Sequence, residues 1–183
     1  MKKVIVTGAT GMIGASMIQQ MLADGIQVTA VCRPNSKKRK NLMNHSLLDI
    51  FECDINDLSK LSEQLPHDYD TFYHFAWDGT YGASRDDVML QEATVQNTLI
   101  AVETAHDLGC SVFVGAGSQA EFGYVNGELS DDIPKNPITG YGIAKLTAGK
   151  LSALLCEQYG IRQSWGRIVS TYGPGDNSYT MVM

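Results

Sequence analysis

The first fourteen residues constrain the fold of this 183-residue chain more than any other stretch. A β-branched apolar run is followed by residues 7–14, which read T-G-x-x-G-x-x-G. Glycines at this spacing are typical of dinucleotide-binding folds when a strand precedes them and a helix follows. Gly8 then permits the sharp turn, Gly11 lets the backbone approach a pyrophosphate, and Gly14 allows close packing of the helix on the sheet. Glycines used for packing alone are the alternative, but the strand–turn–helix context favours a dinucleotide site.

The composition is that of a globular chain with room for one domain and a substantial core. The formal net charge of −6 argues against nucleic acid as a partner, because binding phosphates requires a basic face. No apolar stretch approaches the roughly twenty residues that cross a membrane, and the N-terminus enters a strand without a signal peptide. The four cysteines have no metal-like spacing. We therefore expect a cytoplasmic protein with reduced thiols and no metal site.

Hydrophobic periodicity predicts strands that alternate with helices along the whole chain. After the strand that ends at Thr7, further strands are expected at 28–32, 48–53, 71–76, 111–115 and 163–169. Helices are expected at 12–23, 58–65, 87–108 and 140–159. This alternation requires a parallel sheet with right-handed crossovers, so the fold class is α/β, a Rossmann-type doubly wound parallel sheet.

The end of the second strand is where such folds select their cofactor. An acidic residue there binds the ribose hydroxyls of NAD, whereas an arginine accommodates the 2′-phosphate of NADP. Here Cys32 is followed by Arg33, with Lys37 and Lys38 close behind and no carboxylate. These residues favour NADP(H) and leave NAD(H) possible, since Arg33 and the lysines could also be a solvated loop.

Two further positions lie at predicted strand ends. Asp54 follows the third strand, where its carboxylate could bind an adenine amino group or cap the helix that comes next. His74, within the fourth strand, is more consistent with a packed core residue than with a ligand. Residues 77–86 form an irregular loop at the same sheet edge.

A serine, a tyrosine and a lysine supply candidate chemistry. Ser118 lies in a glycine-rich loop, 115–123, that follows the fifth strand. Tyr141 and Lys145 are four residues apart and share one helix face. A phenol with a pKa of about 10 is a poor base, but a nearby ammonium would lower that pKa and make proton exchange feasible. Ser118 would orient the substrate oxygen.

Taken together, these motifs resemble the extended short-chain dehydrogenase/reductases that act on nucleotide sugars. The resemblance rests on seven segments: residues 7–14, Asp54-Ile55, Phe75-Ala76, Ser118, Phe122-Gly123, Tyr141 with Lys145, and 167–176. It implies that Tyr141 is the acid/base, that Lys145 lowers its pKa and holds the nicotinamide ribose, and that Ser118 binds the substrate oxygen.

The resemblance also implies the residues that contact each ligand. The expected cofactor-binding residues are Gly8, Thr10, Gly11, Met12, Ile13, Gly14, Arg33, Asp54, Ile55, Phe75, Ala76, Trp77, Tyr141, Lys145, Ile168 and Val169. The expected substrate-binding residues are Ser118, Gln119 and Ser170.

The chain departs from the family pattern in two ways. The 4,6-dehydratases of the family carry an Asp-Glu pair after the catalytic threonine, and here these positions are Gln119 and Ala120. The run that contains them, residues 117–123, instead resembles the corresponding run of 4-keto-sugar reductases and related epimerases. Family members are also longer, with a C-terminal domain that closes over the sugar nucleotide. We therefore expect a dinucleotide-binding domain at 1–170 and, at 171–183, the start of a substrate-binding region that is largely absent.

The functional expectation is hydride transfer between NADP(H) and C4 of a nucleotide-linked hexose, as in a 4-keto-sugar reductase. One alternative is an NAD-dependent 4-epimerase that retains its cofactor, and a second is a non-catalytic NADP-binding sensor. The intact set of Ser118, Tyr141 and Lys145 speaks against the sensor. The resemblance further implies a homodimer formed through the helices at 87–108 and 140–159.

Overall fold

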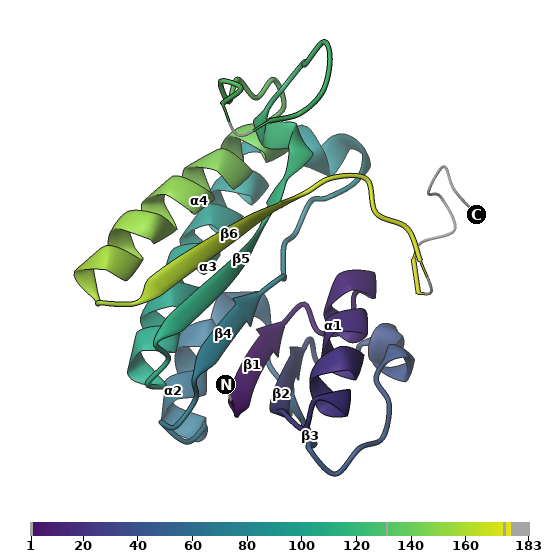
Figure 1. Cartoon of the computed structure of the whole chain (residues 1–183), viewed down its shortest axis with the longest axis vertical. Coiled ribbons are helices and arrows are strands. Elements are labelled where there is room, and N and C mark those ends of the chain that lie inside the picture. Colours follow the sequence, from purple (N-terminus) through teal and green to yellow (C-terminus); the bar gives the residue numbers. More distant parts are fainter. Residues whose placement is uncertain (1, 131, 174, 177–183) are drawn as a thin grey trace.

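The computed structural model describes residues 2–130, 132–173 and 175–176, which form one parallel sheet with helices on both faces (Figure 1). The strands are β1 Lys3–Thr7, β2 Gln27–Cys32, β3 Leu48–Glu52, β4 Thr71–His74, β5 Val112–Ser118 and β6 Arg162–Ile168. Their order in the sheet is β3-β2-β1-β4-β5-β6, which is that of a doubly wound dinucleotide-binding fold. The predicted fold class is therefore confirmed.

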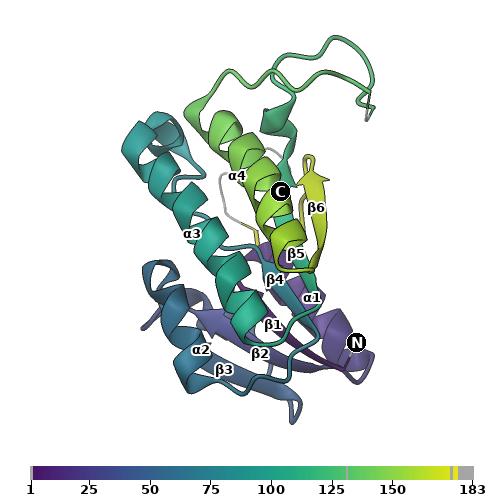
Figure 2. The same ribbon diagram turned by 90° about the vertical axis from the view of Figure 1, so that its left-hand side faces the viewer.

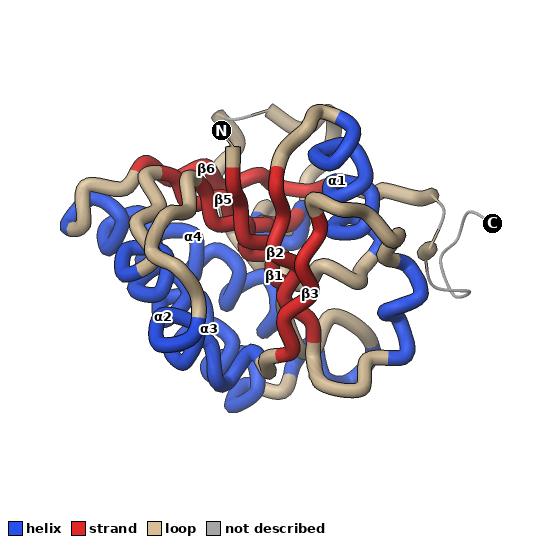
Figure 3. The backbone as a smooth tube through the Cα atoms, turned by 90° about the horizontal axis from the view of Figure 1, so that it is seen from below, coloured by secondary structure: helices blue, strands red, loops and turns tan. Residues whose placement is uncertain are grey.

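The helices divide between the two faces of this sheet. The α-helices are α1 Met12–Ala23, α2 Leu61–Gln64, α3 Val88–Asp107 and α4 Gly140–Gln158. Shorter 3₁₀ helices are η1 Lys37–Asn41, η2 Ile55–Lys60, η3 Gly82–Asp86 and η4 Gln119–Glu121. Figure 3 shows α1 on one face of the sheet and α2, α3 and α4 on the other. In Figure 2, α3 and α4 run side by side along that second face.

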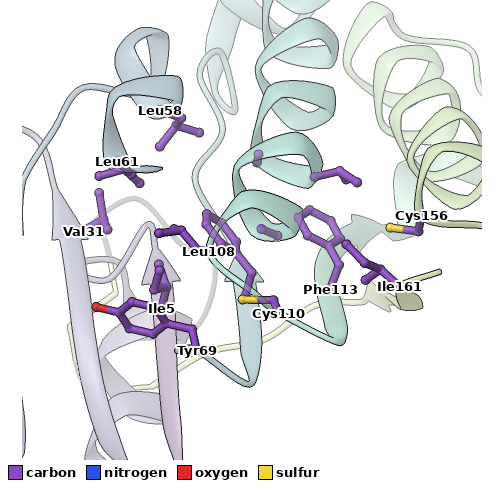
Figure 4. Packing of buried hydrophobic residues seen from close by; sticks show 14 of the residues in the cluster. Ile5, Val31, Leu58, Leu61, Tyr69, Leu108, Cys110, Phe113, Cys156 and Ile161 are labelled. Carbon is purple, nitrogen blue, oxygen red and sulfur yellow. The ribbon is translucent and has the colours of Figure 1, made fainter. Parts of the chain in front are cut away.

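Alternation along the strands explains why both faces are covered. Successive strand residues point to opposite sides of a sheet. Val4 and Val6 pack with Ile18 of α1 in one core cluster, whereas Ile5 packs with Phe113 in a second cluster that includes residues of α3 and α4 (Figure 4). Each face is thus a hydrophobic core of its own, which is the burial that a parallel sheet requires.

His74 is a core residue, as the sequence predicts. Its Nδ1 lies 2.9 Å from Thr7 Oγ1 and its Nε2 lies 3.4 Å from Thr98 Oγ1, so the ring joins β1, β4 and α3. Burial, together with the charge of Lys145, lowers the pKa of His74 to about 3. The imidazole is therefore neutral at physiological pH and is used for packing and hydrogen bonding rather than for acid–base chemistry.

The largest difference from the predicted elements is at β5, which continues to Ser118 instead of ending at residue 115. The segment 115–117 pairs with β6 in register rather than forming a loop. A Cβ at Gly115 or Gly117 would collide with the indole ring of Trp165, which lies over this part of the strand. These glycines therefore make room for a side chain of the neighbouring strand.

The other differences are smaller. β4 ends at His74, two residues earlier than predicted, because the chain leaves the sheet at Phe75. The helix predicted at 58–65 begins instead as the 3₁₀ helix η2 and becomes α-helical only at Leu61.

All four cysteines are buried free thiols. Among the described residues, no helix combines the length and the apolar character needed to cross a bilayer.

Most of the region predicted at 171–183 lies outside the described residues, which include from it only 171–173, 175 and 176. Of these, Thr171, Gly175 and Asp176 line a cavity that begins at the turn after β1.

Candidate active site

Two adjoining cavities open at the carboxyl ends of the strands, the edge where doubly wound folds bind their ligands. The first, of about 430 Å³, extends from Arg33 across the N-terminus of α1 to Ala116. The second, of about 830 Å³, is lined by Ser118, Tyr141 and Lys145. Phe75, Trp77 and Ala116 are among the residues that line both, so the two cavities form one continuous cleft.

The first cavity has the features that a dinucleotide pyrophosphate needs. Gly8 has a φ of +66°, and a Cβ there would lie 2.6 Å from the backbone between Phe75 and Ala76. Gly11 stands at the N-cap position of α1 and has no side chain that could bind the free amide groups, and no acidic residue lies in the first helical turn. The first amide groups of a helix have no intrahelical acceptor, so this uncapped end presents N–H donors and the positive end of the helix dipole to an anion.

The end of this cavity beside β2 and β3 carries positive charge. Arg33 and Lys38 both line it, and Arg33 Nη1 lies 3.9 Å from Asp78 Oδ1. The Arg33 side chain is 69% exposed, so its guanidinium is available to a ligand. Ile55 also lines this end, as expected.

Asp54 is the one predicted site residue that lines neither cavity. Its Oδ1 accepts a hydrogen bond of 3.0 Å from the backbone N–H of Asn56 and thereby caps η2. The capping alternative for this residue is therefore the one the structure adopts. Every other predicted cofactor or substrate residue lines the cleft, including Gln119, Ile168, Val169 and Ser170.

Ser118 and Tyr141 come together from different elements. Ser118 ends β5 and caps η4, where its Oγ accepts a 3.2 Å hydrogen bond from Ala120 N–H. Tyr141 is the second residue of α4, whose N-terminus is capped by Thr139. Burial raises the pKa of Tyr141, and the nearby side chain of Ser118 opposes this and favours the phenolate. Ser118 and Tyr141 thus line the same cavity, with the serine close enough to act on the phenol.

Lys145 is buried at the boundary of the two cavities. Its Nζ donates a 2.7 Å hydrogen bond to the carbonyl of Ala116 and lies 3.7 Å from the ring centroid of Trp77. Burial lowers the pKa of Lys145 to about 7, against a smaller opposite effect of the Glu121 charge. Near neutral pH this lysine is therefore divided between its charged and neutral forms.

The expected effect of Lys145 on Tyr141 stays a prediction, and in this structure another cation lies closer to the phenol ring. Burial raises the pKa of Tyr141, and the groups that oppose this are Ser118 and Arg85 rather than Lys145. The reason is geometric, because Lys145 Nζ points to Ala116 and Trp77 and lies 5.8 Å from the Tyr141 ring centroid. The Arg85 guanidinium carbon lies 4.3 Å from the same centroid.

Sequence reasoning missed Glu121, a carboxylate with no exposed surface directly below Ser118. Its Oε1 accepts hydrogen bonds from Ser118 N–H at 2.8 Å and from Trp165 Nε1–H at 3.0 Å. Its Oε2 accepts one from Arg167 Nε at 2.8 Å. The spacing Ser-x-x-Glu is that of a capping box, so this signal was available in the sequence. The partners on β6 were not visible there.

Gln91, also missed, organises the loop between β4 and α3. Its side chain is buried in α3, and its Oε1 accepts a 3.0 Å hydrogen bond from Trp77 Nε1–H. Its Nε2 donates to the carbonyls of Gly79 and Ser84.

Within the described part of the chain, no group of three or more His, Cys, Asp or Glu residues could hold a metal ion.

Comparisons with known proteins point to one family. A family model described as the NAD dependent epimerase/dehydratase family matches residues 4–183. An uncharacterized UDP-glucose epimerase of Bacillus subtilis (strain 168) is 28% identical over 185 residues, which is 94% of this chain and 57% of that protein. A dTDP-6-deoxy-L-talose 4-dehydrogenase (NAD(+)) of Aggregatibacter actinomycetemcomitans is 28% identical over 146 residues, 78% of this chain and 51% of that protein.

A solved structure gives the same indication. The UDP-glucuronic acid 4-epimerase of Bacillus cereus, in complex with NAD, superposes with a TM-score of 0.80 at 26% identity. The match covers 95% of this chain and 58% of that one. The chain therefore spans about half the length of the curated relatives named above.

Proposed function

Because the chain belongs to the NAD-dependent epimerase/dehydratase family, we propose that its cleft binds a nicotinamide dinucleotide beside a nucleotide-linked hexose and supports redox chemistry at C4 of the sugar. The observation that carries this proposal is that Ser118, Tyr141 and Lys145 line one cavity, in which Ser118 lowers the pKa of the phenol against the effect of burial. Lys145 binds Ala116, a residue that lines both cavities. The acid/base group thus faces the place where cofactor and sugar would meet.

Each side chain has a role that follows from its position. Tyr141 exchanges the proton of the sugar oxygen, and Ser118 holds that oxygen within reach of the phenol. Lys145 places a hydrogen-bond donor, its Nζ, beside Ala116, at the end of the first cavity where the nicotinamide would lie. The cofactor, when bound, supplies or accepts the hydride. The choice of C4 is supported by the relatives, which are named as 4-dehydrogenase and 4-epimerase.

Within this chemistry we favour a 4-keto-sugar reductase. Gln119 and Ala120 follow Ser118, and neither side chain can serve as the acid or base that elimination of water requires. The second candidate is a 4-epimerase, which the epimerases among the relatives favour. A non-catalytic sensor is the least supported, since a sensor does not need Ser118, Tyr141 and Lys145 together in one cavity.

One assay distinguishes these candidates. The chain is mixed with NADPH or NADH and a nucleotide-linked 4-keto-6-deoxyhexose, and the absorbance of the reduced cofactor is followed. A reductase consumes cofactor and sugar in equal amounts. In a second tube, UDP-glucose with NAD⁺ is analysed for UDP-galactose, which only an epimerase forms without net cofactor consumption. Absence of both reactions, with the cofactor bound, would favour the sensor.

The basic end of the first cavity supports NADP(H) as the preferred cofactor. We expect Arg33→Ala to weaken NADPH binding about tenfold and to change NADH binding less than about twofold, since a charged hydrogen bond contributes ~1.5 kcal/mol. Calorimetric titration measures both constants. Arg162→Ala, an exposed arginine at the opposite end of the sheet, is the matched control. Equal weakening for both cofactors, or a wild-type preference for NADH, would contradict the assignment.

We also propose that the chain forms a homodimer through α3 and α4. These helices pack against each other, with the rings of His106 and Tyr159 stacked 4.4 Å apart at one end. Met89 of α3 and Leu154 of α4 are exposed apolar residues. Sedimentation should therefore give twice the chain mass for the wild type and the monomer mass for Leu154→Glu. A monomeric wild type would contradict the proposal.

A further inference from the structure

Hydrogen bonds to α3 and to the start of α4 hold the loop between β4 and α3, residues 77–86, in place. Gln91 of α3 binds the carbonyls of Gly79 and Ser84, at 2.9 Å and 3.0 Å. Asp86 Oδ1 accepts a 2.7 Å hydrogen bond from the backbone N–H of Gly140, the first residue of α4. The loop therefore has a defined position relative to the helix that carries Tyr141.

This loop places one cation against the face of Tyr141. The guanidinium carbon of Arg85 lies 4.3 Å from the ring centroid, within the range of a cation–π contact. Arg85 Nη1 also donates a 3.0 Å hydrogen bond to the carbonyl of Thr80, which holds the side chain in the second cavity. Among the residues that the structure describes, no carboxylate forms an ion pair with Arg85. Its charge therefore acts on the phenol.

We propose that Arg85 is a positioning residue that provides the permanent positive charge beside Tyr141, and that it thereby stabilises the phenolate form in the proton exchange. The assignment rests on the proposed function only in so far as Tyr141 is the acid/base. An arginine remains protonated throughout the pH range in which proteins work. Lys145, whose pKa burial lowers to about 7, is only partly charged there. Arg85 thus adds a permanent charge beside the phenol to the electrostatic role expected of Lys145.

The other groups around Tyr141 do not supply this charge. Burial raises the pKa of Tyr141 most, and the charge of Glu121 from η4 and the phenol of Tyr81 in the loop act in the same direction. The side chain of Ser118 in β5 lowers it, as does the charge of Arg85. Loss of Arg85 would leave the neutral hydroxyl of Ser118 as the main group that favours the phenolate.

The test measures the ionisation of this phenol directly. Difluorotyrosine is incorporated at position 141 alone, because its more acidic phenol titrates in the range where the protein stays folded. Fluorine NMR then gives one titration curve without assignment. Arg85→Met should raise this pKa by about one pH unit, the effect of a cation roughly 5 Å away at a partly buried site. Arg85→Lys should restore most of the difference, and Arg162→Met should change nothing.

The result is independent of turnover, so it fails or succeeds separately from the proposed function. An unchanged pKa in Arg85→Met would overturn the proposal, whether or not the chain reduces a sugar. Where turnover is measured, the limb of the pH profile of kcat/KM that reports Tyr141 should move to higher pH by the same amount. A uniform loss of rate at every pH, with no such movement, would show that Arg85 only maintains structure and would also overturn it.

Discussion

Replacing Tyr141 by phenylalanine is expected to lower kcat by about 10²–10⁴-fold and to leave the dissociation constant of the cofactor within about twofold. The hydroxyl is the only group removed, and the phenylalanine ring keeps the edge contact with Trp77, whose centroid lies 6.0 Å away, and the contact with Arg85. The lost rate is therefore the lost proton transfer. Steady-state kinetics and calorimetric titration of the same preparation measure the two quantities.

The matched control is Tyr124→Phe, because Tyr124 is 93% exposed and lies in neither cavity. It should have wild-type kcat. A Tyr141→Phe variant that turns over at the wild-type rate would exclude this phenol as the acid/base. Loss of cofactor affinity in parallel with rate would instead make Tyr141 a binding residue.

Replacing Glu121 by alanine is expected to lower the free energy of unfolding by about 2–3 kcal/mol, less than for a fully buried ion pair, because the Arg167 side chain is 30% exposed and water can partly solvate it. Arg167 Nε would lose its acceptor, and so would the N–H groups of Trp165 and Ser118. These donors are partly buried, so each one left without an acceptor adds part of the desolvation penalty of a buried donor. Urea unfolding followed by circular dichroism measures the change.

Glu128→Ala provides the comparison, since Glu128 is an exposed glutamate on the loop after η4. Its effect should stay within about 0.5 kcal/mol. Glu121→Gln should lie between the two, because the amide retains an acceptor for Ser118 but not the charge for Arg167. If Glu121→Ala were as stable as Glu128→Ala, the network below Ser118 would not contribute to the fold.

Sequence reasoning succeeded where the signal is local. The glycines of the turn after β1 and the alternation of strands with helices are properties of short segments, and they were enough to predict a doubly wound parallel sheet with a dinucleotide site at the end of β1. Ser118, Tyr141 and Lys145 could be assigned because parallel strands and the helices between them bring their ends to one edge. His74 could be assigned to the core because its neighbours in sequence are apolar.

The errors arose where a distant residue decides the structure. Gly115 and Gly117 have the composition of a loop, and only Trp165, some fifty positions later, gives them a place in a strand. The direction of Lys145 Nζ is fixed by the carbonyl of Ala116, and the charge near Tyr141 comes from Arg85 in a loop without periodicity. No spacing rule relates these residues before the chain folds.

Binding of a nicotinamide dinucleotide in the cleft tests the account most directly. The chain has two tryptophans, and Trp77 lines both cavities whereas Trp165 packs over β5. Titration with NADPH and with NADH should give saturable binding of one equivalent by calorimetry. It should also quench tryptophan fluorescence, because both tryptophans pack against the cluster beside Lys145. No saturable binding of either cofactor would contradict a dinucleotide site in this cleft.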